Sequence, residues 1–401
     1  MKILVISHLF PNTENKNYGI FMARQLIEMA RQGMEITVIV PTIWTPPFMR
    51  IFKKWRNYDH DVPLCQFPGL NAIPVPYLRI TGNWFYRWAG KSMFLALKKS
   101  ACKLHKENNY QIIYARSFFP DGDAAVRLAK VLKLPAVCVG IGRDINIIPH
   151  YSKAIYKRFV EIANRLDGTI ASGKAAAKII DSVSGKQTLS VYGVVDLHRF
   201  TPVADKIPVR EKLGLPLHKK LVLYLGTFKR DKGVYEMLEA FKQLHDEQPE
   251  AILEICGYGV EKEGMLRFIQ EQGLESAIIM QGAIDNEQVN LWMQACDLFV
   301  LPTWHEGMPN AVMEAMACGA PVVVSAVGGL PDAIGDCPGA ILIPPKNVVE
   351  LKNAMLRALA NDDLLKKMSL AARQRAEQSF GVEKTARTII NYLATFVNKT
   401  V

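Results

Sequence analysis

The sequence predicts an α/β protein made of two Rossmann-like domains, each with a doubly wound parallel sheet. Short apolar runs alternate with amphipathic helical stretches along the chain, which is typical of a parallel sheet with helices on both faces. The chain has 401 residues, more than one hydrophobic core usually organises, so two domains are expected. Ligands bind such sheets beside the carboxyl ends of the strands, so we expect the functional residues in the loops that follow them.

Apolar runs in the first half predict a series of buried strands. The first strand covers 2–7, a helix then ends near Gly33, and the next strand begins at Glu35 and is expected to stop at Pro41, which lacks an N–H. Gly19 stands where that helix begins, either as a simple turn glycine or because a side chain there would block a ligand. Further strands are expected at 110–114, 135–140, 168–172 and 189–192.

The second half repeats the pattern and ends in a helix at about 382–397. The stretch 227–233 is a cationic loop between a strand and a helix, which could clamp a diphosphate or be an ordinary solvated turn. Gly257 and Gly259 form a GxG turn after another strand, a weak signal by itself. The strands of this half are expected at 221–226, 251–255, 278–282, 297–302 and 340–343.

The loop and helix after the strand at 297–302 carry the candidate catalytic residues. Pro309 suits the first turn of a helix, and Gly319 suits the position just after its end. The free N–H groups of the first helical turn would bind an anion. Glu306 and Glu314 could accept hydrogen bonds from two hydroxyl-bearing parts of one ligand, as in a nucleotide sugar; the alternative is an acidic loop without a ligand.

Asp121-Gly122-Asp123 is an acidic pattern that could hold a metal ion. It directly follows Pro120 and opens a helix, so we interpret it as a helix N-cap. The seven cysteines lie far apart and have neither metal-ligand nor CxxC spacing. We therefore predict no metal site, reduced cysteines and a cytosolic protein.

The string Glu306-Gly307-Met308-Pro309-Asn310…Glu314-Ala315-Met316-Ala317-Cys318-Gly319 resembles the Glu-x7-Glu signature of retaining GT-B glycosyltransferases of family 4. The resemblance extends over nearly the whole chain. It implies two Rossmann-like domains that face a central cleft, a donor that is a UDP- or GDP-linked sugar, retention of the anomeric configuration and no cofactor.

The run Gly193-Val194-Val195-Asp196…Phe200-Thr201-Pro202 resembles the connector between the two domains of that family. By this resemblance, residues 1–196 form the acceptor-binding domain, onto which the C-terminal helix at 382–401 packs. Residues 197–381 form the domain that binds the nucleotide sugar.

The resemblance also implies roles for single residues. Glu306 would contact the transferred sugar, and Lys232 would stabilise charge on the leaving diphosphate. Ile141 stands where the family usually has a histidine and Thr227 where it usually has an arginine; Arg143 could replace the first, and Lys229 or Arg230 the second. The implied donor-binding residues are Gly19, Thr227, Lys229, Gly257, Ile284, Met308, Pro309, Asn310, Ala311, Val312 and Glu314.

Positive charge and tryptophan are concentrated in the first half. Residues 1–200 hold 28 Lys and Arg against 13 Asp and Glu, whereas residues 201–401 hold 21 against 25. This composition suits an anionic membrane surface, and the alternative is a solvated basic face with core aromatics. Nucleic acid is not expected because no recognition motif is present. Four of the six tryptophans lie within residues 41–92: Trp44, Trp55, Trp84 and Trp88.

No stretch is apolar enough to cross a membrane, and the N-terminal run lacks the pattern of a signal peptide. The run from Gly142 to Asn146 and the overall pattern resemble bacterial transferases of the teichuronic-acid and exopolysaccharide type. That resemblance implies transfer of a hexose to an oligosaccharide linked to undecaprenyl diphosphate, at the cytoplasmic face of the membrane. Arg143, Trp55, Trp84 and Trp88 would lie on the acceptor and membrane side.

Two other functions remain open at this point. Ile141 and Thr227 are consistent with a non-catalytic protein that binds sugar nucleotides. A GT-B epimerase that acts on a free nucleotide sugar is the other alternative. Nothing in the sequence indicates an oligomeric state.

Overall fold

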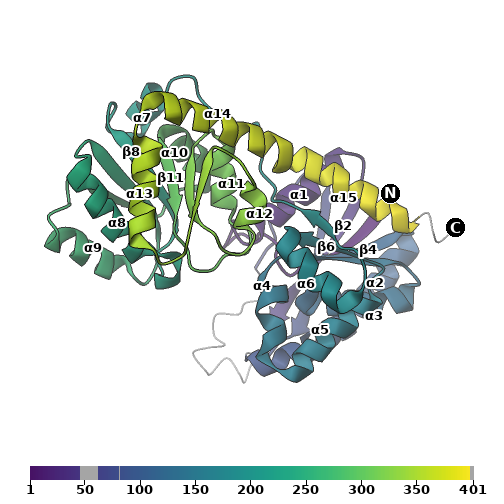
Figure 1. Cartoon of the computed structure of the whole chain (residues 1–401). Helices are drawn as coiled ribbons and strands as arrows, with labels where there is room; N and C mark the ends of the chain where they lie inside the picture. Colours follow the sequence, from purple (N-terminus) through teal and green to yellow (C-terminus); the bar gives the residue numbers. More distant parts are fainter. Residues whose placement is uncertain (46–61, 81, 398–401) are drawn as a thin grey trace. The chain divides into compact units, whose positions relative to one another are not determined.

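Two parallel β-sheets organise the chain (Figure 1). The computed structural model describes residues 1–45, 62–80 and 82–397. It divides into two compact parts: unit 1 is Met1–Tyr192 with the helix that begins at Val382, and unit 2 is Gly193–Gly381. The prediction of an α/β protein with two doubly wound parallel sheets is confirmed.

Unit 1 contains a seven-stranded sheet in the order β3-β2-β1-β4-β5-β6-β7. Every neighbouring pair is parallel. Its strands are β1 (Lys2–Ile6), β2 (Glu35–Trp44), β3 (Leu70–Leu78), β4 (Ile112–Ala115), β5 (Ala136–Gly140), β6 (Gly168–Ser172) and β7 (Leu189–Val191). Its α-helices are α1 (Ile20–Arg31), α2 (Tyr86–Asn108), α3 (Asp123–Leu132), α4 (Arg143–Asn146), α5 (Lys153–Arg165), α6 (Lys174–Ser184) and α15 (Val382–Val397).

Two hydrophobic clusters cover the two faces of this sheet. One cluster joins the strands to α1 and α15, and the other joins them to α2, α3, α5 and α6. Alternate residues of β1 show the division: Ile3 and Val5 belong to the first cluster, and Leu4 and Ile6 belong to the second. Because both faces are covered, the strands are continuously apolar, as the sequence indicated.

Unit 2 contains a six-stranded parallel sheet in the order β10-β9-β8-β11-β12-β13. Its strands are β8 (Lys220–Thr227), β9 (Ala251–Tyr258), β10 (Ile278–Gly282), β11 (Leu298–Leu301), β12 (Val322–Ser325) and β13 (Ala340–Ile343). Its α-helices are α7 (Ile207–Leu213), α8 (Val234–Glu247), α9 (Lys262–Glu271), α10 (Val289–Ala295), α11 (Asn310–Ala317), α12 (Leu330–Ile334), α13 (Val348–Leu359) and α14 (Asp362–Ser379). Short turns of helix precede or follow several of these elements: η2 (Asn83–Phe85), η3 (Phe118–Gly122) and η4 (Ile148–Tyr151) in unit 1, and η5 (Arg230–Lys232) and η6 (Asn286–Gln288) in unit 2.

Proline did not end β2, contrary to the sequence prediction. The strand continues through Pro41 to Trp44. The Ile39 carbonyl faces β1, where it accepts the Ser7 N–H at 3.2 Å, so the Pro41 nitrogen two residues later faces the same side. β1 has already ended at Ile6, so no ladder hydrogen bond is lost there.

β3 was not predicted because Pro74 and Pro76 interrupt its apolar pattern. The strand pairs with β2 and lies at the edge of the described sheet. An edge strand has one side without ladder partners, so it tolerates residues that lack an N–H.

The interpretation of Asp121 and Asp123 as helix caps is wrong. η3 leads directly into α3, and no side chain caps either element. The fully buried Asp121 carboxylate instead accepts hydrogen bonds from His8, and Asp123 pairs with Arg127 and Arg158. A helix that continues from a preceding helical turn leaves no free N–H groups for a cap to satisfy.

All seven cysteines are free thiols. In the part of the chain that the structure describes, no helix combines the length and the apolar character that a membrane span requires. Within the same residues, no group of His, Cys, Asp and Glu side chains could hold a metal ion.

The buried carboxyl group of Glu254 leads to a prediction about the pH dependence of stability. Glu254 in β9 is 1% exposed, and Gln281 Nε2 donates to its Oε2 at 3.0 Å. Burial raises the pKa of Glu254 from 4.5 to about 7. Because the folded pKa is raised, the protonated carboxyl stabilises the fold below pH 4.5, and this stabilisation is lost as the pH rises through about 7.

We therefore expect unit 2 to lose about 1.4 kcal/mol between pH 6 and pH 8 through this residue. Glu254→Gln should abolish that share of the pH dependence, and Glu271→Gln, on an exposed residue of α9, should keep it. Urea unfolding at the two pH values measures the difference. Equal pH dependence in wild type and Glu254→Gln would show that the carboxyl titrates normally.

Candidate active site

The loops at the carboxyl end of the unit 2 sheet pack backbone against backbone. A Cβ atom on Gly233, which has φ +69°, would overlap the Pro302 carbonyl oxygen in the loop after β11. A Cβ on Gly257 would overlap the Gly226 oxygen near the end of β8, and one on Gly328 would overlap the Glu306 oxygen. Gly226 and Gly257 are paired residues of β8 and β9, whereas a Cβ on Gly259 would overlap the Phe228 oxygen between the two loops that follow these strands. The carboxyl ends of four neighbouring strands, β9, β8, β11 and β12, are thereby joined by backbone contacts that only glycine allows.

Hydrogen bonds add to this packing between the loop after β8 and the loop after β11. The Trp304 N–H donates to the Asp231 oxygen at 2.8 Å, and the Thr303 hydroxyl donates to the same oxygen at 3.2 Å. Asp231 lies in η5, directly before Lys232. The backbone on both sides of the proposed catalytic residues is therefore fixed by main-chain contacts.

Lys232 and Glu306 form an ion pair. Lys232 Nζ donates to Glu306 Oε1, and the two side chains are 22% and 20% exposed. The two predicted catalytic residues are thus brought together from positions 74 residues apart in the chain. Glu306 also raises the pKa of Tyr224, after the larger effect of burial. The protonated Tyr224 hydroxyl donates to the Thr227 oxygen at 3.0 Å, which holds the last residue of β8.

The helix that follows Glu306 is α11, and its first residue is Asn310. Pro309 occupies the N-cap position with an extended backbone, φ −75° and ψ 116°, one residue earlier than the first-turn position predicted for it. No side chain caps the helix, so its first N–H groups, from Asn310 to Val312, are not used by a side-chain cap. Gly319 has φ +74° just after the helix, as predicted.

The remaining donor-binding candidates lie on loops and strand ends of unit 2. Lys229 is exposed, and the Arg230 guanidinium lies 5.2 Å from the Tyr235 ring centroid of α8. Ile284 is half-buried in the loop after β10. Met308, Ala311 and Glu314 are half-buried, and Val312 is buried. The Lys229 carbonyl oxygen accepts the Lys232 N–H at 3.0 Å, but among the described residues no side-chain contact joins Lys229 or Arg230 to the Lys232–Glu306 ion pair. Their suggested replacement of an arginine at Thr227 stays a prediction.

Gly19 lies in unit 1, at the start of α1. It has φ +70°, and a Cβ there would lie 2.6 Å from the Leu9 carbonyl carbon and 2.9 Å from the Phe10 nitrogen. The chain's own loop therefore explains the glycine, and a ligand is not needed to explain it.

The acceptor-side candidates of unit 1 are only partly described. Arg143 is exposed and donates to the Tyr151 hydroxyl at 2.9 Å. Trp88 is 45% exposed, and Arg87 and Lys91 lie 5.3 and 5.9 Å from its ring centroid. Trp55 and the side chain of Trp84 lie outside the described residues.

Beside Arg143, Asp144 is nearly completely buried and accepts three backbone N–H groups, from Phe118, Ile141 and Gly142, at 2.8 to 3.0 Å. Burial raises the pKa of Asp144 above its ordinary value, and these hydrogen bonds oppose that shift. Asp144 thus shapes the turn after β5 that carries Ile141 and Arg143.

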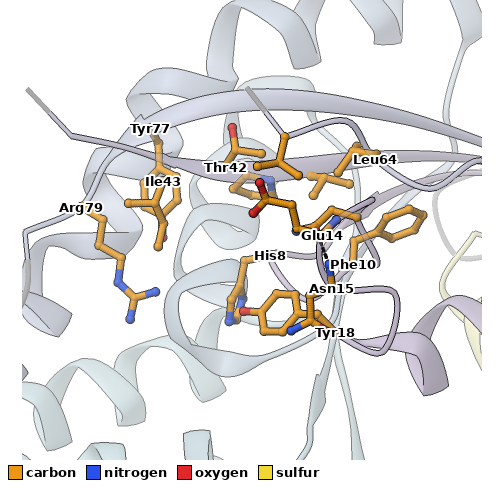
Figure 2. Close-up of a pocket in the computed structure, with 14 residues that line it drawn as sticks. His8, Phe10, Glu14, Asn15, Tyr18, Thr42, Ile43, Leu64, Tyr77 and Arg79 are labelled. Atoms are coloured by element: carbon orange, nitrogen blue, oxygen red, sulfur yellow. Dashed lines mark hydrogen bonds between the residues drawn. The ribbon is translucent and has the colours of Figure 1, made fainter. Parts of the chain in front are cut away.

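Sequence reasoning missed a cavity in unit 1, shown in Figure 2. Its volume is about 330 Å³, and its polar lining includes His8, Glu14, Tyr18, Tyr77 and Arg79. The His8 ring is held by the buried Asp121 carboxylate, with Nδ1 2.9 Å from Oδ2. His8, a polar residue directly after the first strand, was the sequence feature that could have indicated this cavity. Its partner Asp121, 113 residues away, had been interpreted as a helix cap.

Two units, each built on a parallel sheet covered by helices, have the architecture of the GT-B fold. Comparison with known proteins agrees. The model of a family described as glycosyl transferases group 1 matches residues 205–375, which lie in unit 2. The teichuronic acid biosynthesis glycosyltransferase TuaC of Bacillus subtilis strain 168 is 30% identical over 360 residues, 89% of each chain. The chain belongs to the group 1 glycosyltransferase family.

Other relatives match over a smaller part or at lower identity. A D-inositol 3-phosphate glycosyltransferase of Streptomyces bingchenggensis is 30% identical over 49% of this chain and 45% of that protein. Among solved structures, sucrose-phosphate synthase from Thermosynechococcus elongatus has a TM-score of 0.78, with 22% identity and 98% of both chains covered. Anabaena HepE in complex with UDP has a TM-score of 0.73, with 19% identity, 98% of this chain and 100% of that chain covered. These two structures support the GT-B fold.

The backbone packing of the site makes a testable prediction. Gly233 and Gly273 have similar backbone angles, φ +69° and φ +64°, but nothing lies within 4 Å of a Cβ on Gly273. Gly273→Ala should therefore cost only the left-handed strain, about 1 kcal/mol. Gly233→Ala should cost a further 1–3 kcal/mol or so, because the Pro302 carbonyl must move.

Urea unfolding of the two variants measures this difference. Gly233→Ala should also weaken binding of the donor nucleotide, because the loop that carries Lys232 shifts. Equal destabilisation by the two substitutions would contradict the close approach of the two loops.

Proposed function

We propose that this protein is a retaining glycosyltransferase of family 4. It transfers a hexose from a nucleoside-diphosphate sugar to an oligosaccharide linked to undecaprenyl diphosphate, in the synthesis of a bacterial cell-surface polysaccharide. The single observation that carries the proposal is the Lys232–Glu306 pair, held by backbone contacts directly before the uncapped start of α11. The similarity to TuaC supports the polysaccharide as the product.

The charges of the site suit a sugar diphosphate. Lys232 is neutralised by Glu306 in the structure. When the donor binds, its diphosphate competes for the Lys232 ammonium and for the first N–H groups of α11. Glu306 is then available to accept a hydrogen bond from a hydroxyl of the transferred sugar. Glu314, one helical turn into α11, would accept from the ribose diol.

The reaction breaks the bond between the anomeric carbon and the diphosphate oxygen, and it forms a bond from that carbon to the acceptor hydroxyl oxygen. The hydroxyl proton leaves with the nucleoside diphosphate or to solvent. Negative charge grows on the leaving oxygen, and Lys232 with the N–H groups of α11 stabilises it in the transition state. Because these groups supply the positive charge, the proposed mechanism uses no metal ion and no cofactor.

The donor is proposed to be a UDP- or GDP-linked sugar. Structures similar in fold include HepE with UDP and with UDP-glucose. The acceptor is assigned to unit 1, where Arg143, Trp55, Trp84 and Trp88 were predicted on the acceptor side. We further propose peripheral association with the inner leaflet of the cytoplasmic membrane, supported by the excess of Lys and Arg in residues 1–200 and by the cations stacked on Trp88.

Glu306→Gln should test the catalytic assignment. It keeps the shape of the side chain but removes the charge that pairs with Lys232, so we expect kcat to fall by about two orders of magnitude or more. The measurement is release of nucleoside diphosphate in the presence of bacterial membranes. Glu287→Gln, on an exposed residue of η6, is the matched control and should keep wild-type turnover.

Unchanged turnover in Glu306→Gln would remove this residue from the mechanism. Donor binding without any transfer or hydrolysis by the wild type would favour the non-catalytic sugar-nucleotide-binding protein. A product formed from the donor alone would favour the epimerase. The anomeric configuration of the product, read by NMR, decides between retention and inversion.

Trp88 tests the membrane association. We expect Trp88→Ala to lower co-sedimentation with vesicles that contain anionic phospholipid, because the ring and its stacked cations would lie at the interface. Tyr156→Ala is the matched control, since Tyr156 is an aromatic residue of unit 1 with a similar exposure of 43%. An equal effect of the two substitutions would argue against a membrane contact at Trp88.

A further inference from the structure

Arg79 and Arg143 of unit 1 are each held by a tyrosine hydroxyl, and neither forms an ion pair with a carboxylate among the residues that the structure describes. Arg79 Nη2 donates to the Tyr86 hydroxyl at 3.1 Å, and Arg143 Nη2 donates to the Tyr151 hydroxyl at 2.9 Å. The rings of Tyr86 and Tyr151 are neighbours, with their centroids 5.9 Å apart. The principal electrostatic neighbours of each guanidinium are tyrosines, and Arg79 acts on Arg143 through its charge.

A tyrosine holds an arginine without neutralising it. The phenol oxygen accepts one of the five N–H groups of the guanidinium, and it leaves the others and the full positive charge for another partner. Other arginines of unit 1 pair with carboxylates, as Arg127 and Arg158 do with Asp123. The arrangement of Arg79, Tyr86, Tyr151 and Arg143 therefore presents two oriented charges of the same sign, which favours a ligand with at least two negative charges.

Arg79 also lines the cavity of unit 1, together with side chains that suit hydroxyl groups (Figure 2). The Tyr77 and Thr42 hydroxyl oxygens, both in this lining, are buried and have no hydrogen-bond partner among the residues that the structure describes. Tyr77 is 1% exposed, so water does not satisfy its hydroxyl from the surface. Buried polar groups are nearly always paired, so each of these hydroxyls can form a hydrogen bond to a molecule that enters the cavity. The volume of about 330 Å³ is at the lower end of the range for small-molecule sites.

We propose that this cavity and the two arginines form one site for a glycosyl diphosphate, the head of the acceptor. The sugar ring occupies the cavity, and the diphosphate lies against Arg79 and Arg143. The exposed Glu14, which also lines the cavity, would accept from a sugar hydroxyl. The inference rests on the proposed transferase function, because it gives the acceptor side of that function a chemical class.

The first test is titration calorimetry of the full chain with inorganic pyrophosphate in the presence of saturating UDP. UDP occupies the proposed donor site, so pyrophosphate reports on a second anion site. We expect Arg79→Gln and Arg143→Gln each to weaken pyrophosphate binding about tenfold, because each removes charge-assisted hydrogen bonds. Arg165→Gln, on an exposed residue of α5 in the same unit, should change it less than twofold, and all variants should bind UDP alike.

Pyrophosphate affinities that are equal in wild type, Arg79→Gln and Arg143→Gln would overturn the proposal, as would the absence of pyrophosphate binding. These outcomes are separate from a failure of the proposed function, which would appear as loss of UDP binding or of transfer in the wild type. If both substitutions instead lower binding to phosphatidylglycerol vesicles and leave the pyrophosphate affinity unchanged, the arginines contact the lipid surface and the proposal is wrong.

The second test concerns the sugar. Glucose 1-phosphate should bind more tightly than inorganic phosphate to the wild type, because the cavity adds contacts to the ring. Tyr77→Phe removes the unpaired hydroxyl and should reduce that advantage about fivefold or more while leaving the phosphate affinity unchanged. No preference for glucose 1-phosphate over phosphate would overturn the assignment of the cavity to a sugar.

Discussion

The structure of unit 2 depends on the close approach of carbonyl oxygens to glycine α-carbons at one end of its sheet. The Gly226 oxygen lies where a Cβ on Gly257 would be. The Pro302 oxygen lies in the same way against Gly233, and the Glu306 oxygen against Gly328. Side-chain packing can adjust by changing rotamers, but a backbone contact of this kind moves only if a whole loop moves. The four loops therefore behave as one layer, and the positions of Lys232 and Glu306 are set by the main chain.

The partners of the cations at the two candidate sites differ between the units. In unit 2, Lys232 is paired with Glu306, and the second half of the chain has a small excess of acidic residues. In the proposed mechanism, Lys232 exchanges the Glu306 carboxylate for the diphosphate of the donor. In unit 1, Arg79 and Arg143 are held by phenol oxygens and keep their charge. Two oriented arginines without a carboxylate partner attract an anionic ligand over a longer range than a neutralised pair does, which suits the anionic acceptor proposed above.

The sequence predicted most strands of both sheets, because strands covered on both faces are apolar, but it missed β3 and β12. Lys232 and Glu306 were assigned to one site through the family resemblance, and their ion pair was found only in the structure. Sequence reasoning failed where a local pattern had two possible causes. Pro41, Pro74 and Pro76 indicated loops, yet each lies in a strand, next to a finished neighbour or at an edge. The pair His8–Asp121 has no periodic signal, because segments 113 residues apart in the chain bring it together. The pair Arg143–Tyr151 joins two consecutive short helical elements, α4 and η4.

Glycine motifs at such sheet ends are commonly explained by the room that a phosphate needs. Here the space beside Gly19, Gly233 and Gly257 is already filled by the chain itself: Leu9, Pro302 and Gly226 occupy it. A side chain at Gly233 or Gly257 would displace a loop before it met any ligand, and the displacement would reach Lys232 or Thr227. Stability and ligand affinity are therefore coupled through these positions. A substitution there can impair binding although the residue never touches the ligand, and measuring the unfolding free energy beside the affinity separates this indirect effect from a direct contact.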